Sequence, residues 1–352
     1  MDAVATAVDL GQRIRLARLH RGLDQSTLAA SAGLDRTALS KIETGTRSVS
    51  ALELVRIATG LQLTVPDLVF LPPEPVRAAR TSAVGMGDAS EHEARMFDAQ
   101  VALDRLLRDA EQLRSCGHLP EAVLTLDVPR WAGPADAAAL ATKVRAAIGA
   151  GDAPLGALAD MCATFGLWIA PASIGVDGLS ASPRVGFGAA VVGSDVEPGR
   201  RRATAAHELG HHLSGDAYTT DLAVGASRDD RERLIDAFAS ALLLPPTVCS
   251  ERLGGRDAES ARDELVRICH EYRVSWSLGI RAVELAAAPL PARRSEAPTR
   301  DEFLRLVGAP VDEDLAPGTM AKAWVRAVLA AKAAGDITGL RADEMTRLAT
   351  PA

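Results

Sequence analysis

Residues 206–212 have the sequence AHELGHH, which contains the pattern H-E-x-x-H. In a helix, residues four apart lie on one face, so the side chains of His207 and His211 point the same way. Two neutral imidazoles at this spacing can bind one Zn²⁺, with each nitrogen about 2.0–2.1 Å from the ion. Glu208 stands beside the first histidine, where it can act as a general base on a metal-bound water and not as a ligand.

The surroundings of the motif favour a metal site over a surface helix that carries two histidines by chance. The whole chain contains seven histidines, and three of them fall within residues 207–212. The flanking residues are apolar: Ala205, Ala206, Leu209 and Leu213. Apolar flanks predict a buried helix, in which an unpaired histidine or glutamate would be costly.

A third ligand is available downstream, where residues 231–245 (RERLIDAFASALLLP) predict a second helix that ends at a proline pair. Glu232 and Asp236 are four apart and share a face of that helix. A catalytic zinc takes three protein ligands and leaves one position for water, so Glu232 can complete the set. Asp236 can accept the free ring N–H of a ligating histidine. Taken alone, Glu232 is equally compatible with a solvated surface charge.

The sequence RRRATAAHELGHHLSGD (200–216), followed about twenty residues later by E…DAFASALLLP, resembles the ImmA/IrrE family of zinc metallopeptidases. That family is similar to the thermolysin-like enzymes, and the resemblance covers roughly residues 150–285. It implies that His207, His211 and Glu232 bind zinc and that Glu208 is the base. Two positions depart from the family pattern: Ala203, where the family often has Phe, and Asp236, where it often has Asn.

Residues 9–70 predict a compact all-helical unit. Asp24, Asp35 and Ser50 are suited to cap helices that start at the next residue, and Gly33 permits a turn between two of these helices. A helix-turn-helix is indicated by the spacing of a polar residue, a small residue, the turn glycine and a later apolar pair: Gln25, Ala29, Gly33, Leu39 and Ile42.

This spacing, together with the sequence LSKIETGTRSVS (39–50), resembles the XRE family of phage-repressor-like proteins. The resemblance implies a recognition helix whose side chains face the major groove, namely Arg36, Thr37, Ser40 and Lys41. Gln25 would lie near a phosphate at a helix N-terminus, and Arg47 would reach the DNA backbone. We expect Glu43 to pair with an arginine of the first helix. The alternative is a helical module that binds protein.

The charge balance limits how this unit can bind DNA. The chain has a net charge of −7, and aromatic residues make up only 3%, which argues against base-stacking platforms for single strands. Residues 1–70 carry eight basic and seven acidic side chains, so non-specific affinity for phosphate should be weak. A homodimer on a two-fold operator is the usual way in which such a unit gains affinity.

The remaining sequence predicts an α+β protein that is predominantly helical. We divide it into a helix-turn-helix domain (1–72), a linker and connecting helix (73–135), a zincin-like domain with a small sheet and the H-E-x-x-H helix (136–290), and a helical tail (291–352). Strands are expected at 167–170 and twice within 176–193. Residues 76–90 are expected to be a flexible linker, Arg200 to Arg202 to be solvated, and Trp276 to lie in the core.

The cysteines and the lack of targeting or membrane-spanning patterns indicate the cellular compartment. The four cysteines (Cys116, Cys162, Cys249 and Cys269) form no C-x-x-C pair and predict buried free thiols in a cytoplasmic protein. The start of the chain lacks a signal-peptide pattern, and no run of 18 uncharged apolar residues predicts a membrane span. Tyr218 is a candidate oxyanion donor, with simple packing as its alternative.

Two hypotheses follow for function. The first is a DNA-binding transcriptional regulator with a zinc-dependent endopeptidase domain that cleaves a protein partner, by resemblance a repressor or an antitoxin. The second is a regulator whose zincin-like domain no longer cleaves and serves for sensing or docking. The presence of Glu208 beside a complete ligand set favours the first, because a docking module would not need the base.

Overall fold

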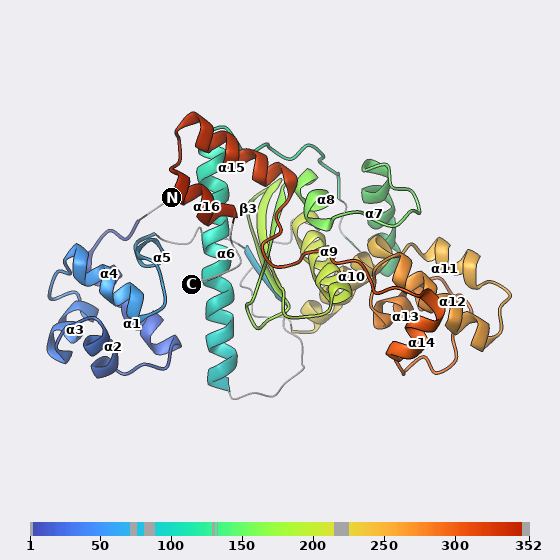
Figure 1. The fold of residues 1–352 in the computed structure, drawn as a ribbon, viewed down its shortest axis with the longest axis horizontal. Coiled ribbons are helices and arrows are strands. Elements are labelled where there is room, and N and C mark those ends of the chain that lie inside the picture. Colours follow the sequence, from blue (N-terminus) through green and yellow to red (C-terminus); the bar gives the residue numbers. More distant parts are fainter. Residues whose placement is uncertain are drawn as a thin grey trace.

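The computed structural model describes residues 3–70, 76–80, 89–128, 131, 133–214 and 225–346 (Figure 1). These residues are mostly helical, with one four-stranded sheet, so the predicted α+β class is confirmed. Tyr218 and the side chain of Asp229 lie outside the described part of the chain.

The N-terminal domain contains five helices: α1 (Ala7–His20), α2 (Gln25–Ser31), α3 (Arg36–Glu43), α4 (Ala51–Gly60) and α5 (Val65–Val69). Asp24, Asp35 and Ser50 accept hydrogen bonds from backbone N–H groups in the first turns of α2, α3 and α4, as the sequence predicted. Gly11 lets α1 cross α3 closely, because an added Cβ would stand 2.2 Å from the carbonyl oxygen of Ile42. The domain has a hydrophobic core of its own, which includes Ile14, Leu39 and Ile57.

The long helix α6 (Ala89–Ser115) connects this domain to the rest of the molecule. Asp67 of α5 is buried and accepts hydrogen bonds from Arg105, at 2.6 Å, and from Arg108. At the N-terminal half of α6, the ring of Phe97 stacks on His20 with ring centroids 4.8 Å apart. The helix-turn-helix domain is therefore docked on α6 by a buried ion pair and an aromatic contact.

The sheet has the strand order β1 (Val76–Arg80), β3 (Gly178–Arg184), β4 (Phe187–Gly193) and β2 (Leu167–Ala172). β2 and β4 run parallel, whereas β3 is antiparallel to both β4 and β1. All residues of β2 and β4 are buried, which agrees with their continuous apolar sequences. Figure 1 shows α6 on one face of the sheet and α9 (Pro198–Ser214) on the other.

The strands predicted at 167–170 and within 176–193 are confirmed as β2, β3 and β4. The prediction of a flexible linker over 76–90 was wrong for residues 76–80, which form β1, and for residues 89–90, which begin α6. The sequence of residues 76–80 shows no clear alternation of apolar and polar side chains, so it does not predict a strand. These residues form a strand because they pair with β3, about one hundred residues away.

Further helices complete the central part: α7 (Pro134–Ala147), α8 (Leu158–Thr164), α10 (Gly225–Leu243), α11 (Pro246–Leu253), α12 (Ala258–Glu271) and α13 (Trp276–Leu285). Trp276 packs against the hydrophobic core as expected but is only half-buried, and its indole nitrogen donates to the carbonyl of Arg294. Cys162, Cys249 and Cys269 are buried free thiols as expected, but Cys116 is exposed, because it follows the end of α6.

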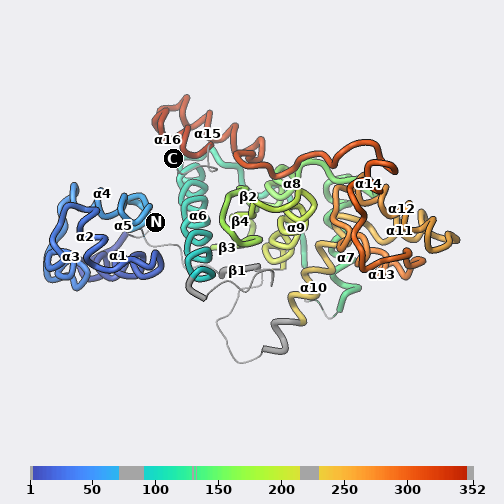
Figure 2. Tube along the Cα trace, turned by 60° about the horizontal axis from the view of Figure 1, so that its bottom comes forward, coloured from blue at the N-terminus to red at the C-terminus, as the bar shows by residue number. Residues whose placement is uncertain are grey.

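The C-terminal helices are α14 (Arg300–Val307), α15 (Lys322–Ala334) and α16 (Gly339–Thr346). Arg262 of α12 binds Glu302 of α14 at 2.6 Å. The chain then returns, so that α15 and α16 lie beside α6 (Figure 2), where Trp324 meets Trp168 with ring centroids 5.8 Å apart. The predicted helical tail thus packs on both ends of the central part.

Among the described residues, no single helix is long and apolar enough to cross a membrane. One bent pair, Asp230–Leu243 with Pro246–Leu253, meets the length and composition requirement, with an angle of 59° between its halves.

The prediction that residues 200–202 are solvated was wrong for Arg201 and Arg202, which are buried, whereas the Arg200 side chain is 38% exposed. Arg202 is fully buried, and its guanidinium binds Asp314 and the carbonyls of Leu155 and Gly156. Arg201 binds Glu313 at 3.0 Å, and Arg200 binds Asp177 at 2.9 Å. Three consecutive charges resemble a solvated run in sequence, but here each finds acceptors on a different segment and fixes the first turns of α9.

We predict that Arg202→Ala destabilises the protein by about 3–5 kcal/mol, because it leaves Asp314 as an uncompensated buried charge. Arg233→Ala removes an arginine whose pair with Asp230 is largely exposed, so it should cost less than about 1 kcal/mol. Urea denaturation followed by tryptophan fluorescence measures both. Equal, small losses would show that the Arg202 pair does not hold α9.

Candidate metal centre

The two helices of the candidate site approach each other closely at Gly210 of α9. An added Cβ there would stand 2.9 Å from the ring of Phe238 and 3.1 Å from Ile235, both on α10. Ala205, Ala206 and Leu209 are fully buried on the same helix. Because a larger residue at position 210 would push the helices apart, this glycine determines how near Glu232 of α10 lies to the histidines of α9.

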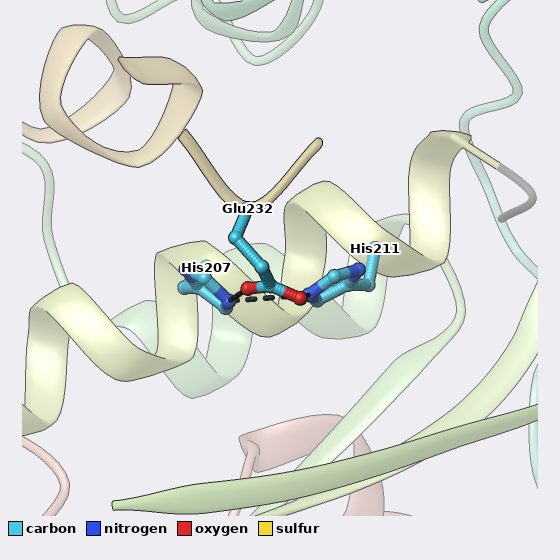
Figure 3. Close-up of side chains that lie close together, drawn as sticks. All are labelled: His207, His211 and Glu232. Carbon is cyan, nitrogen blue, oxygen red and sulfur yellow. Dashed lines mark hydrogen bonds and ion pairs between the residues drawn. The ribbon is translucent and has the colours of Figure 1, made fainter. Parts of the chain in front are cut away.

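The three predicted ligands converge (Figure 3). The Nε2 atoms of His207 and His211 are 3.1 Å apart. One carboxylate oxygen of Glu232 lies 3.2 Å from Nε2 of His207, and the other lies 3.8 Å from Nε2 of His211. One ligand atom can be chosen from each residue so that all lie within 4.8 Å of one another.

This geometry fits a zinc ion. Two ligands about 2.1 Å from a tetrahedral ion are about 3.4 Å from each other, close to the separations seen here. The histidines are 2% and 6% exposed, whereas the Glu232 side chain is 30% exposed. The two histidines on α9 are therefore shielded from solvent, whereas the site is more accessible at Glu232.

Asp236 lies next to His207, as the sequence predicted. Its carboxylate oxygen is 3.0 Å from Nδ1 of His207, and Arg281 donates to its other oxygen at 3.4 Å. A carboxylate that accepts the Nδ1–H leaves Nε2 of the same ring as the lone-pair donor. Nε2 is the atom that faces Glu232.

Glu208 is 0% exposed and points toward the sheet. Ser180 of β3 donates its hydroxyl hydrogen to Oε2 of Glu208 at 2.5 Å. Oε1 is buried and has no hydrogen-bond partner among the residues that the structure describes. Gly178 lies close by, since an added Cβ would come within 3.2 Å of Oε1.

Ser180 was not identified from the sequence, although alternation along β3 carries a signal. Side chains two apart in a strand share a face, and here Gly178, Ser180 and Ser182 share the face toward α9. Ser182 donates to Nδ1 of His212 at 2.8 Å, and Nε2–H of that ring donates to the carbonyl of Phe165. Burial lowers the pKa of His212, and the ring points away from the metal ligands, as expected.

On the helix-turn-helix domain, α3 presents Arg36, Thr37 and Lys41 as exposed side chains, and Ser40 is partly buried. Leu39 and Ile42 on its opposite face are buried in the domain core.

The polar residues around α3 are tied to one another. Glu43 binds Arg18 of α1 at 2.6 Å, as expected, and also accepts from Gln25 at 2.9 Å. Arg47 donates to Glu53 at 2.6 Å. Gln25 and Arg47 are therefore hydrogen-bonded to carboxylates in this structure. To contact a DNA phosphate, each side chain would have to leave its carboxylate or bind both groups at once.

Comparison with known proteins gives two family matches. Residues 14–68 match the model of the helix-turn-helix family, and residues 173–278 match that of the IrrE N-terminal-like domain. No curated protein matches the chain. The solved structure of the restriction-modification controller protein C.AhdI from Aeromonas hydrophila is 40% identical over 18% of this chain and 94% of its own, with a TM-score of 0.18.

Another similar structure is that of PlcR from Bacillus thuringiensis in complex with the peptide PapR7 and DNA. It is 11% identical, covers 96% of this chain and 91% of its own, and has a TM-score of 0.19. The matched segments define a helix-turn-helix protein with a second, peptidase-like domain. More particularly, residues 14–68 are an XRE-type helix-turn-helix domain, and residues 173–278 are an ImmA/IrrE-like domain fused to it.

We predict about one Zn²⁺ per chain. His207→Ala and Glu232→Ala should each sharply lower the metal content, because each removes one of three ligands, whereas Glu208→Gln should retain it. Elemental analysis after dialysis measures all three. If Glu232→Ala held zinc as well as the wild type, the third ligand would have to be another carboxylate, such as Asp229 or Asp230.

Proposed function

We propose that this protein is a transcriptional regulator that binds operator DNA through α3 and cleaves a protein partner with a zinc-dependent endopeptidase domain. The observation that carries the proposal is the position of Glu232, whose carboxylate lies beside the Nε2 atoms of His207 and His211. Helices α9 and α10 bring these groups together although about twenty residues separate them in sequence. By the ImmA/IrrE resemblance, the partner would be a repressor or an antitoxin in the cytoplasm.

Each residue of the proposed site has a separate role in peptide hydrolysis. Bound zinc would act as a Lewis acid and lower the pKa of a coordinated water to about 7. Asp236 holds the tautomer of His207, and Ser180 holds Oε2 of Glu208. Oε1 of Glu208 has no hydrogen-bond partner among the described residues, so its lone pairs are available to take the proton of the attacking water.

The second candidate is a domain that senses or docks without cleaving. It is favoured by the complete burial of Glu208, which must meet water and substrate to act as a base. The two candidates make opposite predictions for a variant that lacks the base.

The proposed DNA contact depends on the exposed face of α3. We predict that Arg36→Ala weakens specific binding by about 5–150-fold, because a good base contact contributes about 1–3 kcal/mol. Arg15→Ala removes the same charge from an exposed position on α1 and serves as the matched control. Mobility shifts with the chain's own promoter at several salt concentrations measure both, and affinity should fall as salt rises.

A fragment of residues 1–72 should bind a palindromic operator site weakly, because it carries the proposed operator contacts while its charge is nearly balanced. If neither the fragment nor the full chain shifts any promoter DNA, the five-helix domain binds protein and not DNA.

Chemistry and DNA binding should be separable by substitution. Glu208→Gln keeps the shape of the side chain but removes the base, and a general base contributes a factor of about 10²–10⁴. Operator affinity should equal that of the wild type, while the protein partner stays intact and the target genes stay uninduced. A reporter assay with an immunoblot of the candidate repressor measures this. Normal induction with no cleaved fragment in either strain would favour the sensing module.

A further inference from the structure

The sheet edge next to the candidate site is occupied by a segment of the chain's own linker. β1 (Val76–Arg80) is the end strand of the sheet, and it pairs with β3 antiparallel and without a bulge. Without β1, the backbone N–H and C=O groups along one side of β3 would form an open edge. Open edges of this kind bind extended peptides by adding them as a further strand.

The register of β1 places its centre beside the catalytic candidates. Ala78 lies opposite Ser180, and Ser180 donates to Oε2 of Glu208. Arg80 lies opposite Gly178, where an added Cβ would approach Oε1 of the same glutamate. The helix α9, which carries His207 and His211, also contacts β1. The backbone of residues 77–79 is thus where an extended substrate on β3 would run past the base.

We propose that β1 is a built-in pseudosubstrate strand, which occupies the peptide-binding edge of β3 and keeps the site closed until it is displaced. The proposal rests on the peptidase function proposed above. Glu208 is fully buried, and a base must meet its substrate, so the proposal requires the site to open when β1 leaves the edge. It also names the substrate class: an extended, unstructured peptide segment that pairs antiparallel to residues 178–182.

The position of β1 in the chain links the two domains. β1 follows the last helix of the helix-turn-helix domain and precedes α6, on which that domain docks. A tethered strand competes with a free peptide at an effective concentration on the order of millimolar. Displacing β1 therefore needs either a high local concentration of partner or a change in how the N-terminal domain is held.

The test uses the full chain with Ala78→Pro and Ala79→Pro together. In an antiparallel pair, alternate residues donate to the neighbouring strand, so one of two adjacent prolines removes a ladder hydrogen bond whichever residue donates. Ala78→Ser with Ala79→Ser keeps both N–H groups and is the matched control. Glu208→Gln is added to every form, so that no bound peptide is cleaved during the measurements.

The first readout is backbone hydrogen exchange. We expect exchange of those amides in residues 178–182 that face β1 to rise at least about tenfold in the proline variant and to stay at the wild-type rate in the serine control. Exchange in β2 and β4 should not change. If protection is lost throughout the sheet, β1 is an integral strand and the proposal is wrong. Unchanged exchange at 178–182 would equally overturn it.

The second readout is binding of a fluorescent peptide with the sequence of residues 74–82. The proline variant should bind it at least about tenfold more tightly than the wild type or the serine control, because the tethered competitor is gone. Equal binding, or none, in all three forms would show that β3 is not a peptide-binding edge.

A final comparison separates this proposal from the peptidase function. With Glu208 restored, the proline variant should also cleave the peptide faster than the wild type. Tight binding without cleavage would leave the pseudosubstrate strand standing and remove the peptidase function. Cleavage at equal rates in the proline variant and the wild type would support the peptidase function and overturn the pseudosubstrate strand.

Discussion

The close contact between α9 and α10 at Gly210 is the constraint on which the candidate site depends. It lets Phe238 and Ile235 pack directly on the zinc-motif helix, and this packing brings Glu232 to 3.2 Å from Nε2 of His207. Two histidines one turn apart can bind a metal only weakly alone, and the carboxylate from a second helix completes the set. A buried apolar contact, and not the charged groups themselves, therefore determines where Glu232 lies relative to the two histidines.

Helix α6 is the second organising element, because three parts of the molecule pack on it. Its Arg108 binds Asp67 of the helix-turn-helix domain, and the next residue, Asp109, binds Arg341 of the C-terminal helices. Burial raises the pKa of Asp109 to about 6. Adjacent residues of α6 thus hold the N-terminal domain and the C-terminal helices on this helix, and α6 also packs on β3 and β4. A shift of α6 would therefore move the N-terminal domain relative to the sheet.

Much of the site could be predicted from the sequence, because metal ligation and helix capping depend on short, fixed spacings. His207 and His211 are paired by helical periodicity, and the capping residues Asp24 and Asp35 act within three positions of themselves. Contacts between segments that lie far apart in the sequence could not be predicted in this way. Ser180 binds Glu208 from 28 positions away, and β1 becomes a strand only because β3 is present.

The arginines at positions 200–202 also show that a partner far away in the sequence cannot be predicted from local sequence. Arg202 has the sequence context of a surface charge, yet it is buried against Asp314, which lies 112 positions later. No local pattern distinguishes a charge that will be solvated from one that will meet a distant partner. Sequence reasoning is therefore most reliable where the partners of a side chain lie within one turn, and least reliable where the fold supplies them.

We propose that two histidines and one glutamate of this chain hold a zinc ion. X-ray absorption spectroscopy of the purified zinc-loaded protein tests it most directly. We expect a four-coordinate zinc with nitrogen and oxygen ligands at about 2.0–2.2 Å and an imidazole signal that corresponds to two histidines. A sulfur ligand at about 2.3 Å, or six oxygen ligands without imidazole, would contradict it.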